Sequence, residues 1–482
     1  MRGRGSRATG RCTQEPRHGG PPCAPGLLLL ALLLTAASAR AQAEEEEPPP
    51  RPADAPTIES DREQSREVHP WLALGEVTAI NLAVWLYDRT IGQKEWARVT
   101  LDDWGNNLRT GFVWDADDFS ANQFAHPYHG GLYYTAARDN GLPFVACLPY
   151  TLLGSAQWEL FAENEPPSIN DLINTSIGGM AMGEALYRLS SMVLDTEATG
   201  RERFGREFLA GAISPVRGIN RLLRGDSFRK EPTPAEWWPL DFAGWGTLGY
   251  LNLGDGKLLR ETKNQFFAQL SLRYGDAFTG DIRRPFDAFE GHVQFTTREN
   301  SLVSHARLAG VLVTQSLKRS EEDSLRLALV QQLSYVDTLA YEVGGQSLSA
   351  VLMQQHRLSR STLLKSSLGL EGHILTGISS EHSGEGRNYD YGPGVGLEGR
   401  VIYGRDSWDI VTLEAGIARV VILDGAGGTH QILTGRALLD FPVVDRLGLG
   451  TELNLFQRHS RFDYFPDVRK ETYELRVFFS IH

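Results

Sequence analysis

The chain has 482 residues, with 48 basic and 60 acidic side chains and a formal net charge of −12 at neutral pH. This balance excludes proteins that bind nucleic acid through a basic surface, because such surfaces need an excess of Lys and Arg to displace counterions. The length allows two or three structural units.

Residues 1–43 are typical of a signal peptide. Arginines precede the apolar run GLLLLALLL, and small residues follow it as Ala37-Ser38-Ala39 and Ala41-Gln42-Ala43. The run is too short to span a bilayer. We therefore expect an exported protein, in which residues 44–68, acidic and rich in proline, form a disordered linker.

Cysteine usage is sparse. Cys12 and Cys23 lie in the expected signal peptide, so Cys147 would be the one cysteine of the mature chain. A single thiol cannot form an internal disulfide. In the apolar context FVACLPY we expect Cys147 to be a small core residue.

Residues 69–230 are predicted to form a helical domain. Apolar residues recur there at helical spacing, as in EVTAINLAVWLYDRTIG. In PPSINDL, Ser168 is a candidate N-cap with Asp171 three residues later, which resembles a capping box. Downstream, Gly179 and Gly183 stand in small-xxx-small spacing, so we expect a second helix to approach closely there.

Residues 238–482 alternate apolar and polar positions with the period of a β-strand. In LGLGTELNLFQR, for example, Leu449 and Leu453 share one face, and Glu452 and Asn454 share the other. A soluble β-sandwich also alternates. The segments of ten or more residues, and the alternation of long and short connections towards the C-terminus, favour a transmembrane barrel. The predicted fold class is α+β, with a helical domain followed by an antiparallel barrel of about twelve strands.

The stretch HPYHGG is predicted to begin a helix, with His126 as the cap, Pro127 at the first helical position and Gly141 just beyond the end. His126 and His129 then lie about one turn apart at the positive end of the helix dipole. Three roles stay open for these histidines. In the first, both are packed, hydrogen-bonded residues; in the second, they hold an anion such as a lipid phosphate; in the third, one of them is a general base or a metal ligand. Two histidines alone are a weak signal for zinc, so no metal or cofactor is predicted.

Further polar groups follow this stretch. Ser155, Glu159 and Glu163 are spaced to share one helix face, where the acids meet either water or cations such as Arg109, Arg138 or Arg188. The candidate catalytic residues are His126, His129, Ser155 and Glu159, which would form a Ser-His-Glu hydrolytic set if their geometry permits. The alternative is a structural network of ion pairs.

Several motifs resemble an uncharacterised domain-of-unknown-function family of Gram-negative envelope proteins. The motif positions are Phe119, Asn122, His126 to Gly130, Tyr133, Tyr134 and Arg138, followed by GSAQWE with Glu159, by Glu163, by PSINDL with Ser168, Asn170 and Asp171, and by GGMAMGE with Glu184. The resemblance is dense over about 70–230 and looser over the strands. It implies an outer-membrane location and transfers no chemistry.

Two hypotheses for function follow. The favoured one is an outer-membrane envelope protein whose helical domain closes the barrel or docks a periplasmic or lipid partner. We expect that domain to sit mostly beneath the barrel or against the inner leaflet of the outer membrane, because a twelve-stranded lumen has room for one helix at most. The alternative is an acyl hydrolase-like enzyme at the membrane face that uses His126 or His129 with Ser155 or Glu159.

Overall fold

The computed structural model describes residues 67–115, 118–255, 263–298, 301–320, 322–383, 387–405 and 408–482. The expected signal peptide, and all but the last two residues of the expected linker, lie outside this part of the chain.

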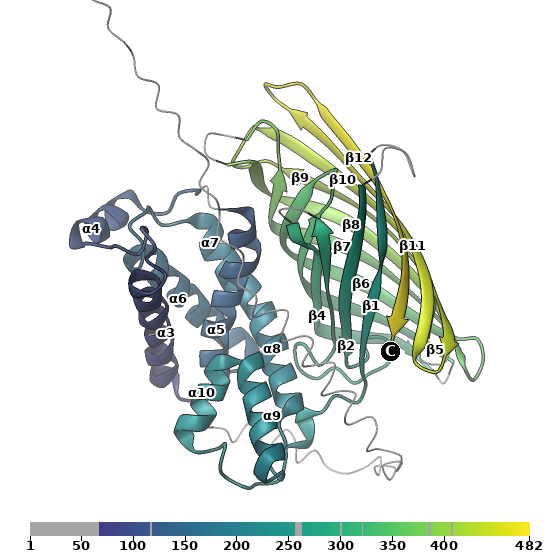
Figure 1. Ribbon diagram of the computed structural model, residues 1–482, viewed down its shortest axis with the longest axis horizontal. Coiled ribbons are helices and arrows are strands. Elements are labelled where there is room, and N and C mark those ends of the chain that lie inside the picture. Colours follow the sequence, from purple (N-terminus) through teal and green to yellow (C-terminus); the bar gives the residue numbers. More distant parts are fainter. Residues whose placement is uncertain are drawn as a thin grey trace, which may run out of the picture. The chain divides into compact units, whose positions relative to one another are not determined.

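The described chain is helical first and then all strands (Figure 1). The helical elements are α3 (Pro70–Thr90), α4 (Leu101–Thr110), the π-helix η1 (Ala121–Ala125), α5 (His126–Asp139), the 3₁₀-helix η2 (Phe144–Cys147), α6 (Leu148–Phe161), α7 (Ile169–Ile173), the π-helix η3 (Asn174–Gly178), α8 (Gly179–Val193), α9 (Gly200–Ile213), α10 (Pro215–Arg224) and the 3₁₀-helix η4 (Ala235–Trp237). The strands are β1 (Phe242–Asp255), β2 (Lys263–Tyr274), β3 (Phe289–Arg298), β4 (Ser301–Arg319), β5 (Asp323–Asp337), β6 (Glu342–Arg357), β7 (Thr362–Ser379), β8 (Tyr389–Arg405), β9 (Trp408–Val421), β10 (Gly428–Val444), β11 (Leu447–Phe462) and β12 (Val468–Ile481).

The strands form one closed antiparallel barrel, in which each pairs with its neighbours in sequence and β1 pairs with β12. The prediction of about twelve strands is confirmed, and so is their length, which runs from 10 residues in β3 to 19 in β4. Because the strand number is even, β1 begins and β12 stops at the same end of the barrel, which we call the terminal end. The connection 445–446 lies at that end, and the longer connections 380–388 and 463–467 lie at the other.

The barrel is apolar outside and polar inside. In β11, Leu449 is 45% exposed on the outer face, whereas Glu452 is 4% exposed on the inner face. The exposed outer residues include Leu248, Phe266, Leu329, Leu352, Leu370, Leu397, Leu413, Leu439, Leu449 and Phe479. This distribution is the reverse of that in a soluble protein and is the one that a bilayer requires of a closed barrel.

Ion pairs cross the lumen at mid-height. A continuous series of contacts runs through Glu290, Arg400, Glu414, Arg436, Glu452, Arg476 and Glu474, with Arg307 paired to Glu398 beside it. We call these nine residues the ion-pair layer. One cavity opens from the layer towards the terminal end and another towards the opposite end, and both are lined by Arg307 and Glu398.

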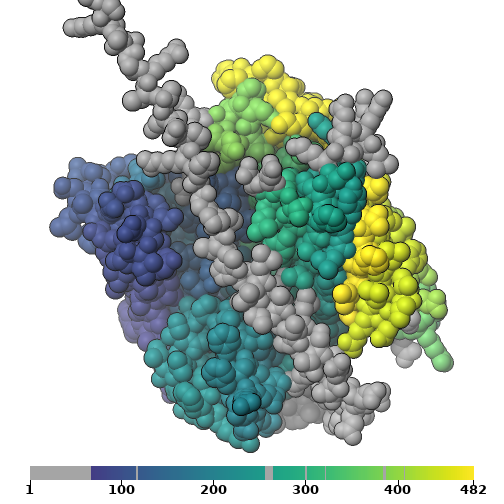
Figure 2. Space-filling model, in the orientation of Figure 1, coloured from purple at the N-terminus to yellow at the C-terminus, as the bar shows by residue number. Residues whose placement is uncertain are grey.

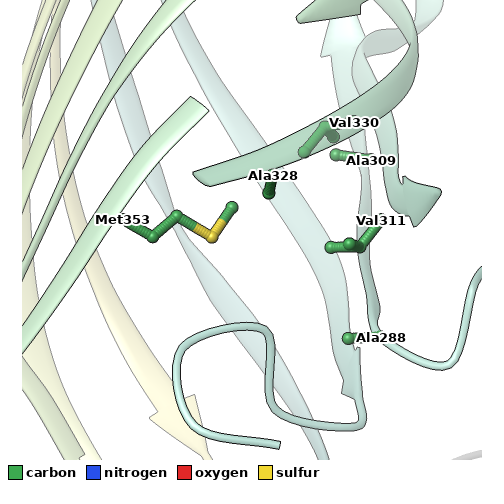
Figure 3. Packing of buried hydrophobic residues seen from close by; sticks show 6 residues of the cluster. All are labelled: Ala288, Ala309, Val311, Ala328, Val330 and Met353. Atoms are coloured by element: carbon green, nitrogen blue, oxygen red, sulfur yellow. The ribbon is translucent and has the colours of Figure 1, made fainter. Parts of the chain in front are cut away.

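The connection between β2 and β3 folds into the lumen at the terminal end. An apolar cluster on the inner wall, shown in Figure 3, comprises Ala288, Ala309, Val311, Ala328, Val330 and Met353. Ala277, Phe278 and Ile282 of the connection pack against it. Arg326 donates to the backbone carbonyl of Thr279 at 2.7 Å, which ties the connection to the wall.

Two central helices, α5 and α8, contact each other through glycine. A Cβ added to Gly130 would lie 1.7 Å from the carbonyl oxygen of Thr175, and one added to Gly179 would lie 2.4 Å from the backbone of Gly130. The expectation of a close helix approach at Gly179 and Gly183 is confirmed, since Gly183 meets Tyr134 in the same way. We call the helices α3 to α10 the helical bundle.

The helical bundle packs on the outer wall of the barrel and not beneath it, so the first of the two expected positions is wrong. Gln331 and Gln346 point outwards, because the residues next to them in the strands line lumen cavities. Gln331 donates to the carbonyl of Ile177, and Gln346 donates to Asn174, both at 2.9 Å. These polar side chains on the wall supply the partners that an apolar belt lacks.

Aromatic side chains extend this contact towards the end of the barrel opposite the terminal end. The cluster contains Phe119 and, from the strands, Tyr335, Leu375, Tyr389 and Tyr391, with Trp114, Phe124 and Ile173 packed against it. Further along, Arg188 within α8 pairs at 2.8 Å with Asp287, which lies in the connection just before β3. The bundle is thus held to the barrel both before α8 and from within it.

Candidate functional site

Three side chains from three helices converge in the helical bundle. His126 of α5, Glu159 of α6 and Asp171 of α7 each offer one ligand atom, and these three atoms lie within 4.8 Å of one another. Glu159 and Asp171 are each 2% exposed. We call these three residues the His-Glu-Asp cluster.

Each member of the cluster is held by a hydrogen bond to a neutral group. The His126 Nδ1 lies 3.3 Å from the Thr175 hydroxyl, which leaves Nε2 facing Asp171 Oδ1 at 3.2 Å. The backbone N–H of Ser168 donates to Glu159 at 2.9 Å. The amide of Asn170 donates to Asp171 at 3.1 Å.

The α-helix α5 begins at His126, as a helix start at HPYHGG requires, but His126 is helical and is not the predicted cap. The preceding residues 121–125 form the π-helix η1, and Ala125 already has helical backbone angles. Pro127 has no N–H to donate one turn back, and the wider turn before it accommodates its ring. Because the chain is already helical, the amides near His126 do not form a free helix N-terminus for an anion. The predicted end is confirmed, since Asn140 caps α5 and Gly141 has a φ of 87°.

The predicted cap at Ser168 is confirmed, because its side chain accepts from the Asp171 N–H at 3.1 Å. Ser168 therefore has two roles: its side chain caps α7, and its backbone N–H donates to Glu159. The turn at Ser168 thus positions both carboxylates of the cluster.

His129 lies one turn from His126 but belongs to a different set of contacts. Its ring packs against Tyr133 and Trp158, with centroids 4.7 and 4.8 Å away, and its Nε2 is 3.0 Å from the Tyr133 hydroxyl. Burial lowers the pKa of His129 to about 3, so the ring is neutral. Neutral and enclosed by aromatic rings, His129 is a packed residue.

The hydrolytic set does not assemble. Ser155 donates to the backbone carbonyl of Asp171 at 3.5 Å, and Glu163 accepts from the Trp158 indole. Glu159 bonds to the Ser168 backbone and His129 to Tyr133. Nucleophilic catalysis needs the serine hydroxyl bonded to its base, and here the two are held by separate partners.

Glu184 anchors a second polar cluster. It accepts from the Tyr134 hydroxyl at 2.6 Å, from Arg138 at 3.1 Å and from Arg188 at 2.8 Å. Burial alone would raise the pKa of Glu184, but the two arginines outweigh it and hold the pKa below its usual range. Of the cations considered for the Glu159 face, Arg138 and Arg188 pair with Glu184. The third candidate cation, Arg109, donates to the Gly105 carbonyl at 2.9 Å.

Charge in the His-Glu-Asp cluster is unbalanced. Burial raises the pKa of Glu159 well above its usual range, and the neighbouring Glu163 and Asp171 raise it further, against the opposing effect of His126. Two buried carboxylates this close cannot both carry a charge without a proton or a cation between them. Either a proton or a cation at the cluster removes this conflict.

Sequence reasoning missed how the motif residues connect. Asn170 donates to Asn122 at 3.0 Å and to Asp115 at 2.7 Å, and Asn122 donates to Tyr389 of β8. Tyr389 begins the stretch YDYGPGVG of β8, far from the earlier motifs in the sequence. Cys147 is buried and forms no disulfide, as expected.

Comparisons with known proteins match one domain family over part of the chain and several solved barrel structures. A family model described as a domain of unknown function (DUF3943) matches residues 111–216, which hold the whole His-Glu-Asp cluster. This match agrees with the expected resemblance to an uncharacterised family. No curated relative matches the chain.

Solved outer-membrane structures align with the barrel at low identity. The NanC porin has 7% identity and a TM-score of 0.27, over 48% of this chain and 98% of that one. The channel DcaP of Acinetobacter baumannii has 9% identity and a TM-score of 0.22, over 50% and 97%. An active-site mutant of outer membrane phospholipase A from Escherichia coli has 12% identity and a TM-score of 0.23, over 51% and 91%. The barrel's own closure and apolar belt make this chain an outer-membrane β-barrel protein.

Proposed function

We propose that this outer-membrane protein uses its barrel to hold the helical bundle at the level of the bilayer, with membrane lipid as the partner of the bundle's outer surface. The observation that carries the proposal is the distribution of polarity in the bundle. The helical bundle, like the barrel, buries many polar side chains and exposes many large apolar ones. The bundle and the barrel lie against each other.

The outer surface of the bundle is apolar over several helices. Its exposed large apolar side chains include Trp71, Leu72, Leu82, Leu86, Leu108, Leu152, Leu153, Phe161, Phe204, Phe208, Ile219 and Leu222. Figure 2 shows the side chains of α9 (teal), which carries Phe204 and Phe208, at the surface. The exposed positions of α3 between Trp71 and Tyr87 carry no charge. Soluble monomers rarely expose an apolar surface of this extent.

The interior of the bundle is rich in polar groups. Its buried polar side chains include Asn81, Asn107, Asn122, Arg138, Asp139, Thr151, Ser155, Glu159, Asn170, Asp171, Asn174, Glu184, Arg188, Arg217 and Asn220. Hydrogen bonds between helices through such groups, with small residues at the contact, are the way that helices associate in a membrane. Within the described residues, none of the helices has the length and apolarity to cross a bilayer by itself.

The position on the wall supports lipid as the occupant. Asn174 and Ile177 contact Gln346 and Gln331 of the wall, and Arg188 contacts Asp287 just before β3. On the outer face of β5, Leu329 stands two residues from Gln331 and is an exposed residue of the apolar belt. The bundle therefore contacts the wall beside the belt that faces lipid.

A photocrosslinking experiment tests the proposal. A benzophenone amino acid is placed at Leu82, Leu152 or Phe208 in the full chain, expressed in outer membranes and irradiated. We expect lipid adducts by mass spectrometry at all three positions, as at Leu370 in the barrel belt. Position Glu202, an exposed acid of α9, serves as the polar control and should give few adducts.

Two other outcomes contradict the proposal. Adducts to a protein at Leu82 and Leu152 would mean that a periplasmic partner covers the bundle. Adducts at Leu370 alone would mean that the bundle surface meets water. The lipid-modifying enzyme lacks support from the geometry, because Ser155, His129 and Glu159 are held apart by separate hydrogen bonds.

A further inference from the structure

We infer that the His-Glu-Asp cluster binds one divalent transition-metal ion of the Zn²⁺ class. The ligands are Nε2 of His126 and one carboxylate oxygen each from Glu159 and Asp171. No part of this inference depends on the lipid partner proposed above.

The donor atoms have nearly the spacing that such an ion requires. Ligands about 2.1 Å from a tetrahedral ion lie about 3.4 Å from one another. His126 Nε2 and Asp171 Oδ1 are already 3.2 Å apart. The separations within the group do not exceed 4.8 Å, so a small rotation of the flexible Glu159 side chain closes the set.

The groups around the donors provide a second, independent observation. A metal-binding histidine usually bonds an oxygen through its other ring nitrogen, which fixes the tautomer and the ring orientation. Thr175 does this for His126, at 3.3 Å from Nδ1. The Ser168 N–H donates to Glu159 and the Asn170 amide donates to Asp171, and these bonds orient the two carboxylates.

Nearby arginines form ion pairs with other acids of the bundle. Arg138 and Arg188 bind Glu184, and Arg224 binds Asp139 at 3.1 Å. A buried carboxylate is stable as an ion only when it is paired or coordinated. A divalent cation compensates both carboxylates at once, which His126 alone cannot do.

The donor set selects the class of ion. One imidazole and two carboxylates suit Zn²⁺ or a neighbouring first-row ion, whereas Ca²⁺ takes six to eight oxygen ligands and Cu(I) prefers sulfur. Three protein ligands leave one position of a tetrahedral ion for water or another small ligand. His129 stays outside the set because its ring is enclosed by Tyr133 and Trp158.

The test uses the full chain, folded in detergent micelles, stripped with a chelator and titrated with ZnCl₂ by calorimetry, with the bound metal counted by elemental mass spectrometry. We expect one Zn²⁺ per chain. His126→Gln, Glu159→Gln and Asp171→Asn should each weaken binding by at least tenfold. The matched controls His69→Gln and Glu202→Gln, at exposed positions, should bind as the wild type does.

A positioning variant keeps the test decisive if a ligand variant fails to fold. Thr175→Val removes the hydroxyl beside His126 Nδ1 and keeps all three ligands, so we expect weaker binding by about tenfold at unchanged stoichiometry. In wild-type protein, Co²⁺ should give the visible absorption of a tetrahedral site, and Thr175→Val should shift it. The inference fails if the wild type binds less than half an equivalent of Zn²⁺, or if folded ligand variants bind it as tightly as the controls.

Discussion

The side-chain amide of Asn122 donates a hydrogen bond to the Tyr389 hydroxyl at 3.2 Å, across 267 positions of sequence. Asn122 also accepts from Asn170, which in turn bonds to Asp171. A continuous series of polar contacts therefore runs from the His-Glu-Asp cluster to strand β8. Motif residues from both halves of the chain thus meet in one hydrogen-bonded network.

We predict that Asn122 and Tyr389 are energetically coupled. Tyr389→Phe and Asn122→Ala should each lower the free energy of unfolding of the bundle by about 1 kcal/mol or more, since each removes a buried hydrogen bond. A double-mutant cycle in urea, followed by tryptophan fluorescence, should give a coupling of about 0.5–1.5 kcal/mol. Strict additivity would mean that the bond contributes nothing to docking.

We predict that Gly130→Ala destabilises the bundle strongly. The added Cβ would lie 1.7 Å from the Thr175 carbonyl oxygen, so α5 and η3 must move apart, at a cost of about 3 kcal/mol or more. Gly75→Ala on α3 is the matched control, because nothing lies within 4 Å of its Cβ. It should be neutral or stabilising by up to about 1 kcal/mol. Urea unfolding distinguishes the two, and equal effects would contradict the close approach.

We predict that Arg188→Ala loosens the bundle from the barrel. Arg188 joins Glu184 to Asp287, and its loss leaves both carboxylates short of a partner in a buried setting, at a cost of about 3 kcal/mol. Limited proteolysis of the folded protein should then release the helices from an intact barrel. Arg229→Ala removes an exposed pair with Asp226 and should change the pattern little. Equal cleavage of both variants would show that Arg188 has no role in docking.

We predict that the ion-pair layer limits conduction through the lumen. Arg307→Ala removes the side chain between the two cavities and leaves Glu398 without that partner. In planar bilayers, the unit conductance should rise several-fold over the wild type and become more selective for cations. Lys318→Ala, at an exposed pair near the terminal end, is the control and should conduct as the wild type does. High conductance in the wild type would mean that the layer is no barrier.

The barrel was predictable from the sequence because a strand of a membrane barrel records its environment locally. Successive residues of β11 face lipid and lumen in turn, so the period of two is visible in the sequence of a single strand. The cap at Ser168 was predictable for the same reason, since its partner is three residues away. Two errors arose where distant contacts decide the outcome. First, the chain is already helical before His126, and Gly130, one turn later, lies directly against Thr175. Second, the bundle docks on Gln331 and Gln346, whose sequence positions do not differ from those of other alternating strand residues.

The His-Glu-Asp cluster could not be predicted as a set. Its members come from three helices, and His126 and His129 look equivalent in the sequence. Only the packing of α5 turns one imidazole towards Asp171 and the other towards Tyr133. Ser155 was a reasonable candidate by spacing, but the contact to the Asp171 carbonyl consumes its hydroxyl.

The docking surface on the wall also bears on how the molecule is assembled. The residues that hold the bundle lie on β5, β6 and β8 and at Asp287 just before β3, whereas the ring closes between β1 and β12. A curved sheet that has formed from β3 to β8, with Asp287 at its start, already presents the whole surface, while its two edges are still apart. The helices can therefore template the middle of the sheet during biogenesis, and closure of the seam can follow as the last step without any rearrangement of the bundle.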